Sequence, residues 1–234
     1  DIAVDPLEGT NFAANNLPGA LSVIAVSCKN NLFNAPETYM NKIAYGSNIE
    51  KGVIDLDYNF SKNMKNLADF KNKKLENITI CILDRPRHKE IINEAKKLKL
   101  KTKLISDGDI SGALLVTDEK FEVDLFLGIG GGPEGVLAAC ALDAYNCGFQ
   151  GRFIFDNDIA TKRAKDMGIV DLKKKYELKD IVKGDSIFCA TGITNGELVK
   201  GVEISGDLFM TDTFVTHKSK NIKKNIQEKV QKIT

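Results

Sequence analysis

The sequence predicts an α/β fold with an α+β N-terminal part. From about residue 76 onward, short apolar runs rich in β-branched residues alternate with helical segments. This alternation is typical of a mainly parallel sheet with helices on its faces. A chain of 234 residues can bury about 70% of its surface, which is enough for one large domain or two small ones.

The first third of the chain contains two candidate strands and one helix. Residues 2–4 are the end of a buried strand, and residues 21–27 (LSVIAVS) form a second one. A polar turn follows at 30–36. We expect a helix over 61–72, with Ser61 as its N-cap and apolar residues at helical spacing. A charge-rich link at 71–75 then predicts a domain boundary, with an N-terminal domain over 1–74 and a C-terminal domain over 75–234.

The remaining elements follow in regular order. We expect strands at 78–83, 101–105, 123–128, 186–190 and 208–215, and helices at 87–98, 110–116 and 133–145. The last of these helices is rich in Ala and Leu and should be buried. For residues 222–233 an amphipathic helix, a strand and a frayed tail all stay open.

Composition excludes several classes of function. Lys and Arg total 33 against 32 for Asp and Glu, so the net charge is +1, whereas a dedicated nucleic-acid binder usually has a basic excess. No apolar run reaches the ~20 residues of a membrane helix. Five cysteines without CxxC spacing indicate reduced thiols and a cytoplasmic protein. With two histidines in the chain, a bound metal would depend mainly on carboxylates.

The first candidate site is residues 5–10 (DPLEGT), at the carboxyl end of the first strand. Pro6 and Gly9 favour a turn that brings Asp5, Glu8 and Thr10 together. Carboxylates of this kind hold Mg²⁺ together with substrate phosphate and water, and the hydroxyl would orient the attacking water. An ordinary turn with a helix cap is the alternative.

The second candidate is residues 128–135 (GIGGGPEG), between a strand and a helix. Successive glycines let an anion approach the backbone, and the helix start supplies free N–H groups. No Gly-Lys-Ser/Thr follows, so this is not a Walker loop. Glu134 would complement the helix dipole or bind a cation beside a phosphate.

Four weaker candidates also follow strands. Two arginines within residues 84–88 (DRPRH) suit capture of phosphate, although a solvated helix start is an equal alternative. Asp107 and Asp109 would accept hydrogen bonds from sugar hydroxyls, or act only as a cap. Tyr39 would donate to a phosphate or pack as a half-buried side chain. The loop 191–196 reads as a turn. Together these segments suit a phosphorylated polyol and a divalent cation.

The motifs carry a family resemblance. Residues 5–10, 34–46 (NAPETYMNKIAYG), 83–88, 106–114 (SDGDISGAL), 128–142 (GIGGGPEGVLAACAL) and 190–202 (ATGITNGELVKGV) resemble, in this order, class II fructose-1,6-bisphosphatases of bacteria. Some lineages of that family also act on sedoheptulose 1,7-bisphosphate. The resemblance runs to about residue 217. Residues 5–10 are also similar to the DP-(I/L)-D-G-T motif of the lithium-sensitive, metal-dependent phosphatases, whose layered sugar-phosphatase fold is therefore implied.

The resemblance implies a site and an activity. It assigns Mn²⁺ or Mg²⁺ as the cofactor, a small-molecule sugar bisphosphate as the substrate, and a place in gluconeogenesis. Asp5, Glu8 and Glu134 would be metal ligands, and Thr10, with Glu8 and Asp5, would be catalytic. The implied substrate-binding residues are Glu8, Gly9, Thr10, Tyr39, Arg85, Pro86, Arg87, Asp107, Gly108, Asp109 and Gly131.

Two departures from the family pattern bear on this expectation. The family has roughly a further quarter of its length ahead of DPLEGT, including an Asp and a Glu of the metal cluster, so we expect an N-terminally truncated copy. The family often has Ala at the position of Gly132 and an Arg after the late strand, where this chain has Thr216, His217 and Lys218. A non-catalytic phosphosugar-binding fragment therefore stays an alternative, as does a nucleotide-dependent enzyme built on residues 128–135. Homo-oligomerisation stays open.

Overall fold

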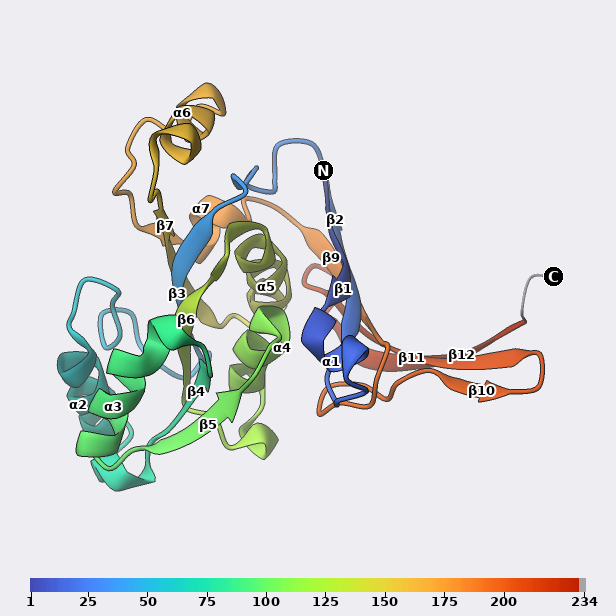
Figure 1. Ribbon diagram of the computed structural model, residues 1–234, viewed down its shortest axis with the longest axis horizontal. Coiled ribbons are helices and arrows are strands. Elements are labelled where there is room, and N and C mark those ends of the chain that lie inside the picture. Colours follow the sequence, from blue (N-terminus) through green and yellow to red (C-terminus); the bar gives the residue numbers. More distant parts are fainter. Residues whose placement is uncertain (232–234) are drawn as a thin grey trace.

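The computed structural model describes residues 1–231 and consists of two six-stranded sheets with helices between and outside them (Figure 1). The first sheet has the order β1-β2-β9-β11-β10, with β12 paired to β11. Its strands are β1 (Ile2–Glu8), β2 (Leu21–Ser27), β9 (Ser186–Gly192), β10 (Glu203–Ser205), β11 (Leu208–His217) and β12 (Ile222–Gln231). All of its pairs are antiparallel.

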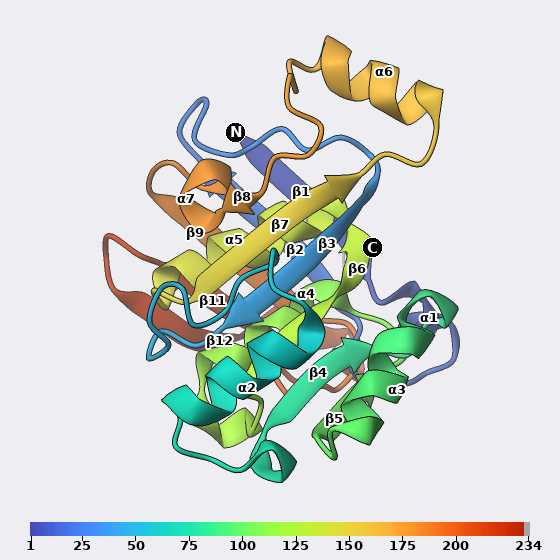
Figure 2. The ribbon, with the colours of Figure 1, turned by 90° about the vertical axis from the view of Figure 1, so that its left-hand side faces the viewer.

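The second sheet has the order β5-β4-β6-β3-β7-β8 and is seen face-on in Figure 2. Its strands are β3 (Tyr39–Tyr45), β4 (Thr79–Leu83), β5 (Lys101–Ile105), β6 (Leu125–Gly131), β7 (Gly148–Ile154) and β8 (Tyr176–Glu177). The pairs of β4 with β5 and β6 are parallel, and the pairs that involve β3 and β7 are antiparallel. The expected mainly parallel sheet is therefore wrong. Only β4 has parallel partners, β5 and β6, and β3 enters antiparallel between β6 and β7.

The larger core lies between the two sheets, around α4 (Asp109–Leu114) and α5 (Gly132–Ala144) (Figure 1). Helix α5 is apolar on all sides, which is stable only for a helix covered all round. It packs on β7 of the second sheet and on β9 of the first, and Val136 through Ala144 are buried. This helix starts at the candidate glycine loop, so the core fixes the position of that loop.

A second core lies on the opposite face of the second sheet. There α2 (Phe60–Phe70) and α3 (Lys89–Lys97) cover β3, β4 and β6, with Met64, Leu67 and Ile92 turned inward (Figure 2). Asn59, rather than Ser61, caps α2: its side chain accepts a hydrogen bond from the Lys62 N–H. The remaining helices are α1 (Thr10–Ala14), α6 (Asp158–Asp166) and α7 (Leu178–Ile181).

The outer face of the first sheet carries exposed apolar side chains. Ile2 pairs with Val26, Val4 with Ile24, and Val26 with Ile187, and all five side chains are at least 39% exposed. Such a row is unusual, because one face of an antiparallel sheet normally turns polar side chains to water. In the described part of the chain, helices cover only the other face of this sheet (Figure 1).

The structure resolves three further expectations. Residues 222–231 form β12, so the strand alternative is correct there; residues 232 and 233 of that expectation lie outside the described residues. The expected buried helix and the late strand are confirmed as α5 and β11. The domain division after residue 74 stays a prediction. The sheets do not follow it, since β3 pairs with β6 and β7, and β2 with β9.

Candidate active site

The first motif ends a strand instead of following one. Strand β1 runs through Glu8, with a register shift between Asp5 and Glu8, and the chain turns only at Gly9, where φ is +77°. The expected turn at residues 5–10 is therefore wrong at Pro6 and right at Gly9. The shift brings two carboxylates of one strand together, and Gly9 then directs Thr10 into the exposed start of α1.

Asp5 and Glu8 form a carboxyl pair. Glu8 is 5% exposed, and its Oε1 accepts a hydrogen bond of 2.8 Å from the Ile110 N–H. Burial raises the pKa of Glu8 well above its ordinary value, and a hydrogen bond between the carboxyls of Glu8 and Asp5 raises it further. Two carboxyls in such contact repel when both are ionised, and this repulsion favours a bound cation.

The second motif shows why its glycines are required. Strand β6 ends at Gly131 and α5 begins at Gly132. A Cβ at Gly130 would lie 1.6 Å from Asp109 Oδ2, and one at Gly131 would lie 1.9 Å from Glu134 Oε2. These glycines therefore admit two carboxylates of the protein against the loop, a role that the prediction of a phosphate cradle did not include.

Glu134 lies in the first turn of α5. Burial raises its pKa, its own backbone N–H and Lys42 lower it, and Asp109 and Asp5 raise it. The Glu134 carboxyl therefore responds to the charge of Asp5, from the first sheet, and to that of Asp109, from the start of α4. The two candidate motifs belong to one electrostatic cluster.

The arginine motif joins the same cluster from the end of β4. Arg85 pairs with Asp107 at 3.1 Å, and a second oxygen of Asp107 accepts a hydrogen bond from the Asn11 N–H. The Arg87 guanidinium lies 5.0 Å from the centre of the Tyr39 ring, and its Nε donates to the Ile129 carbonyl at 2.7 Å. The structure thus brings Arg87 and Tyr39 to the edge of the glycine loop and Arg85 to Asp107. Pro86 starts the 3-10 turn that carries Arg87.

His88 fixes this edge from beneath. It is 2% exposed; its Nδ1 contacts the Leu83 carbonyl at 2.8 Å and its Nε2 accepts from the Ile129 N–H at 2.7 Å. These contacts define a neutral ring that donates from Nδ1. Burial accordingly lowers the pKa of His88. The predicted site contained no role for this residue, although its place after the two arginines put it on the same turn.

Sequence reasoning also missed Lys42, in the middle of β3. Its side chain is 2% exposed, forms an ion pair with Asp109 and donates to the Gly131 carbonyl at 2.8 Å. The sequence feature that could have indicated a buried lysine is its place directly before the apolar residues Ile43, Ala44 and Tyr45. Strand β3 itself was not predicted, because Asn41 and Lys42 interrupt its apolar pattern.

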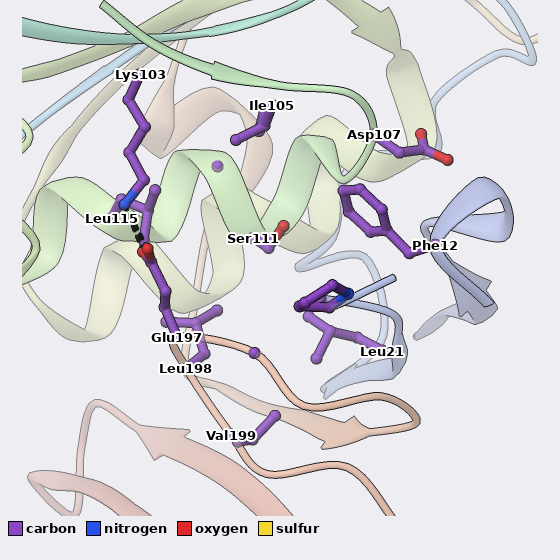
Figure 3. A pocket seen from close by; sticks show the side chains of 14 residues that line it. Phe12, Leu21, Lys103, Ile105, Asp107, Ser111, Leu115, Glu197, Leu198 and Val199 are labelled. Atoms are coloured by element: carbon purple, nitrogen blue, oxygen red, sulfur yellow. Dashed lines mark hydrogen bonds and ion pairs between the residues drawn. The ribbon is translucent and has the colours of Figure 1, made fainter. Parts of the chain in front are cut away.

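A pocket borders the cluster beside Asp107. It has about 620 Å³ of space including its open mouth, and Phe12, Ile105 and Leu115 give it largely apolar walls. Figure 3 shows Asp107 at its edge and the Lys103–Glu197 ion pair on the opposite side. The loop 193–201 closes the pocket from below. Within that loop, Thr194 accepts a hydrogen bond from the Ala20 N–H and donates one to the Leu17 carbonyl. The first two residues of the predicted turn, Thr191 and Gly192, belong to the end of β9 instead.

The donor set has the chemistry of a hard cation site but is small. In the described residues no three His, Cys, Asp or Glu side chains are gathered closely enough to hold a metal ion. The Asp5–Glu8 pair still fits Mg²⁺ or Mn²⁺, because such ions are often held by one or two carboxylates and complete their shell with water and substrate phosphate. Within residues 1–231 no helix is long and apolar enough to cross a membrane.

Comparison with known proteins decides the family. Residues 1–230 match the family described as bacterial fructose-1,6-bisphosphatase, glpX-encoded. The chain belongs to this family. It is 38% identical to the fructose-1,6-bisphosphatase class 2 of Haemophilus influenzae, over 95% of this chain and 71% of that protein. The expected family, its α/β fold and its class of enzyme, a phosphatase, are thereby confirmed.

Relatives in cyanobacteria have a broader name. D-fructose 1,6-bisphosphatase class 2/sedoheptulose 1,7-bisphosphatase proteins of a Synechococcus strain and of Prochlorococcus marinus are 38% and 37% identical to this chain, each over 92% of it. The chain spans 65% and 68% of their lengths. The family consists of metal-dependent phosphatases. The roles of individual residues in this chain stay predictions.

Proposed function

We propose that this bacterial fructose-1,6-bisphosphatase relative hydrolyses the 1-phosphate of fructose 1,6-bisphosphate, giving fructose 6-phosphate and inorganic phosphate. The observation that carries the proposal is the convergence of the ends of four strands, β1, β4, β5 and β6. Their carboxylates, arginines and glycine loop are joined by direct contacts, including Glu8 with Ile110, Arg85 with Asp107, and Arg87 with Ile129. Cytoplasmic gluconeogenesis is the proposed setting.

Asp5 and Glu8 are the proposed holders of the divalent cation, with Glu134 as a further ligand. When bound, Mn²⁺ or Mg²⁺ would neutralise the phosphoryl charge and lower the pKa of a coordinated water. Thr10 follows Glu8 by two residues and is exposed, so its hydroxyl is available to orient a water toward phosphorus. The water oxygen forms the new P–O bond, the bond from phosphorus to the C1 oxygen breaks, and that oxygen takes up a proton.

The substrate contacts form the rest of the proposal. Arg85 and Arg87 would pair with phosphate oxygens, and the exposed Tyr39 phenol would donate to the same group. Asp107 and Asp109 flank Gly108, whose φ of +86° starts α4 and turns both side chains into the cluster. They would accept hydrogen bonds from the sugar hydroxyls. Gly9, Pro86 and Gly131 would border the substrate through backbone atoms.

A second candidate function is binding of the sugar phosphate without turnover. The small donor set favours it, since the described residues gather fewer than three metal-binding side chains. Sedoheptulose 1,7-bisphosphate is a second candidate substrate, because the cyanobacterial relatives carry that activity in their names.

A phosphate-release assay separates these candidates. It compares fructose 1,6-bisphosphate with sedoheptulose 1,7-bisphosphate, each with Mn²⁺ or Mg²⁺ and each after removal of metal by a chelator. Metal-dependent release from the fructose ester supports the main proposal. Calorimetric binding of the ester without release would instead support the binding-only candidate, and release that is insensitive to the chelator would contradict the role of Asp5 and Glu8.

A further inference from the structure

Lys42 is an unusual residue for its position. It lies in the centre of β3, paired with Gly128 of β6 on one side and Gly151 of β7 on the other. Its side chain is 2% exposed. Lysine is rarely buried to this extent unless its charge is paired, because removal of the ammonium from water is strongly unfavourable. A buried lysine in a central strand therefore needs an explanation in its partners.

The partners of Lys42 are both site segments. The ammonium pairs with Asp109 Oδ2, at the first residue of α4, and donates to the carbonyl of Gly131, at the last residue of β6. One cation thus ties the sugar-side carboxylate to the glycine loop. Lys42 is buried away from solvent, so its direct contacts with the site are these two groups.

The pairing leaves one oxygen of Asp109 available. Lys42 occupies Oδ2, whereas Oδ1 is buried and has no hydrogen-bond partner among the described residues. A buried carboxylate oxygen without a donor is unfavourable in the free protein and favours any ligand that supplies a hydroxyl. The position of the Lys42 ammonium determines which oxygen is free.

The backbone is shaped around the pair. Only a glycine at 130 leaves room for the Asp109 carboxylate, and a Cβ at Gly135 would come within 3.3 Å of Lys42 Cδ and 2.9 Å of Met40 Sδ. The glycines of the 128–135 motif therefore accommodate the lysine and its aspartate as well as the loop's own turn.

Charge supports the same assignment. Asp5, Glu8, Asp109 and Glu134 contribute four carboxyl groups to the cluster, and the charge of Lys42 opposes their mutual repulsion at Glu134. The lysine is held there by its ion pair with Asp109 and its hydrogen bond to the Gly131 carbonyl. It compensates part of the negative charge before substrate or metal arrives.

We propose that Lys42 is a positioning residue, which holds Asp109 against the glycine loop so that Asp109 Oδ1 is presented to a hydroxyl of the sugar. This inference rests on the proposed function, since it concerns the same sugar phosphate. Lys42 itself touches neither phosphate nor metal. The effect of Lys42 on sugar-phosphate affinity should consequently disappear when residue 109 can no longer form an ion pair with the lysine ammonium.

The test is a double-mutant cycle with Lys42→Met, Asp109→Asn and the double variant. For each protein, calorimetry measures the affinity for fructose 6-phosphate, and phosphate release gives KM and kcat separately. We expect each single variant to weaken sugar-phosphate affinity about 10- to 100-fold. The double variant should lose no more affinity than the single variant that binds less tightly, because the two changes remove the same interaction.

Two controls separate positioning from loss of fold. The double variant removes both buried charges, which is often tolerated where a single unpaired charge is not. Lys71→Met removes a lysine that pairs with buried Asp124 outside the cluster, and it should leave affinity and kcat unchanged. Calorimetric Mn²⁺ binding without sugar gives a further readout. In Lys42→Met, Mn²⁺ binding should be equal or tighter because a nearby positive charge is lost, whereas a distorted site would weaken Mn²⁺ binding.

Additive losses of affinity, or Mn²⁺ binding that weakens in parallel with sugar binding, would overturn the role of Lys42. If the wild-type chain binds and hydrolyses the fructose ester but the losses of affinity in the variants are additive, only the role of Lys42 is overturned. A wild-type chain that neither binds fructose 6-phosphate nor releases phosphate overturns the proposed function and this inference together.

Discussion

A single methyl group at residue 130 should disable the site. In Gly130→Ala the new Cβ would lie 1.6 Å from Asp109 Oδ2, and the carboxyl carbon would be at 2.3 Å. An ordinary contact between a carbon and an oxygen is more than about 3 Å, so the carboxylate has to shift by roughly 1.5 Å or more. It cannot do so and keep its pair with Lys42, because that ammonium is also bound to the Gly131 carbonyl.

The expected losses follow from that shift. Overpacking of a tight site reduces the free energy of unfolding by about 1–3 kcal/mol. Misplacement of a substrate-positioning group by about 1 Å lowers catalysis by about 100-fold. We therefore expect kcat/KM for fructose 1,6-bisphosphate to fall at least about 100-fold, with the folded protein retained. Phosphate release measures the first quantity and urea unfolding the second.

A matched control adds the same methyl group elsewhere. Gly52 has a φ of +91° and no atom within 4 Å of an added Cβ, so Gly52→Ala introduces backbone strain without a clash. It should reduce stability by about 1 kcal/mol and leave kcat/KM unchanged. A Gly130→Ala protein with near-normal kcat/KM would show that Asp109 does not lie against the loop during turnover.

Three further predictions concern other parts of the cluster. Glu134→Gln should lower kcat by about 100-fold or more in a phosphate-release assay at saturating Mn²⁺, since a charged ligand is lost, and unchanged kcat would remove Glu134 from the proposed metal site. Arg85→Gln should raise KM by about 10- to 100-fold and weaken fructose 6-phosphate binding in calorimetry, because a charge-assisted bond is lost and Asp107 is left without its partner. For His88, burial holds the pKa below 6.5 in the folded protein, so the unfolded chain takes up the proton first as the pH falls. The contribution of His88 to the free energy of unfolding should therefore decrease as the pH falls below about 6.5 and change little above that pH. Urea unfolding of the wild type and of His88→Asn across pH 5 to 8 checks this, and an identical pH dependence in both proteins would contradict it.

The strand ends of the site could be predicted because their chemistry is local. Each candidate motif consists of polar residues or glycines directly after an apolar run, and the structure has strands β1, β4, β5 and β6 at or beside these places. Parallel and neighbouring strands then bring such ends to a common edge. The contact of Arg85 with Asp107 is a consequence of that topology, whereas Glu8 reaches the start of α4 from the other sheet.

The centre of the second sheet could not be predicted in this way. Strand β3 contains Asn41 and Lys42, and a pattern of apolar periodicity treats such residues as exposed. Lys42 is buried because Asp109 and the Gly131 carbonyl, from two distant segments, supply its partners. Pairing of this kind depends on tertiary structure. The mixed order of the sheet has the same origin, since β3 is inserted between strands that follow it in the chain.

The meaning of the glycines also required the structure. Their spacing indicated a loop that admits an anion, which is correct in kind, but the anions nearest to Gly130 and Gly131 are the carboxylates of Asp109 and Glu134. The sequence alone does not show whether the negative group beside a glycine loop is a bound anion or a carboxylate of the protein. The turn at Gly9 was predicted for its residue type, and its φ of +77° agrees with that reason.

The most direct test of the account is ³¹P NMR of the protein with fructose 1,6-bisphosphate, before and after addition of Mn²⁺-free Mg²⁺. Once Mg²⁺ is added, we expect the 1-phosphate signal to be replaced by that of inorganic phosphate while the 6-phosphate signal remains. Asp5→Asn should abolish this change. Loss of the 6-phosphate, or equal release before Mg²⁺ is added, would contradict the assignment of Asp5, Glu8 and the surrounding cluster as a metal-dependent site for the 1-phosphate.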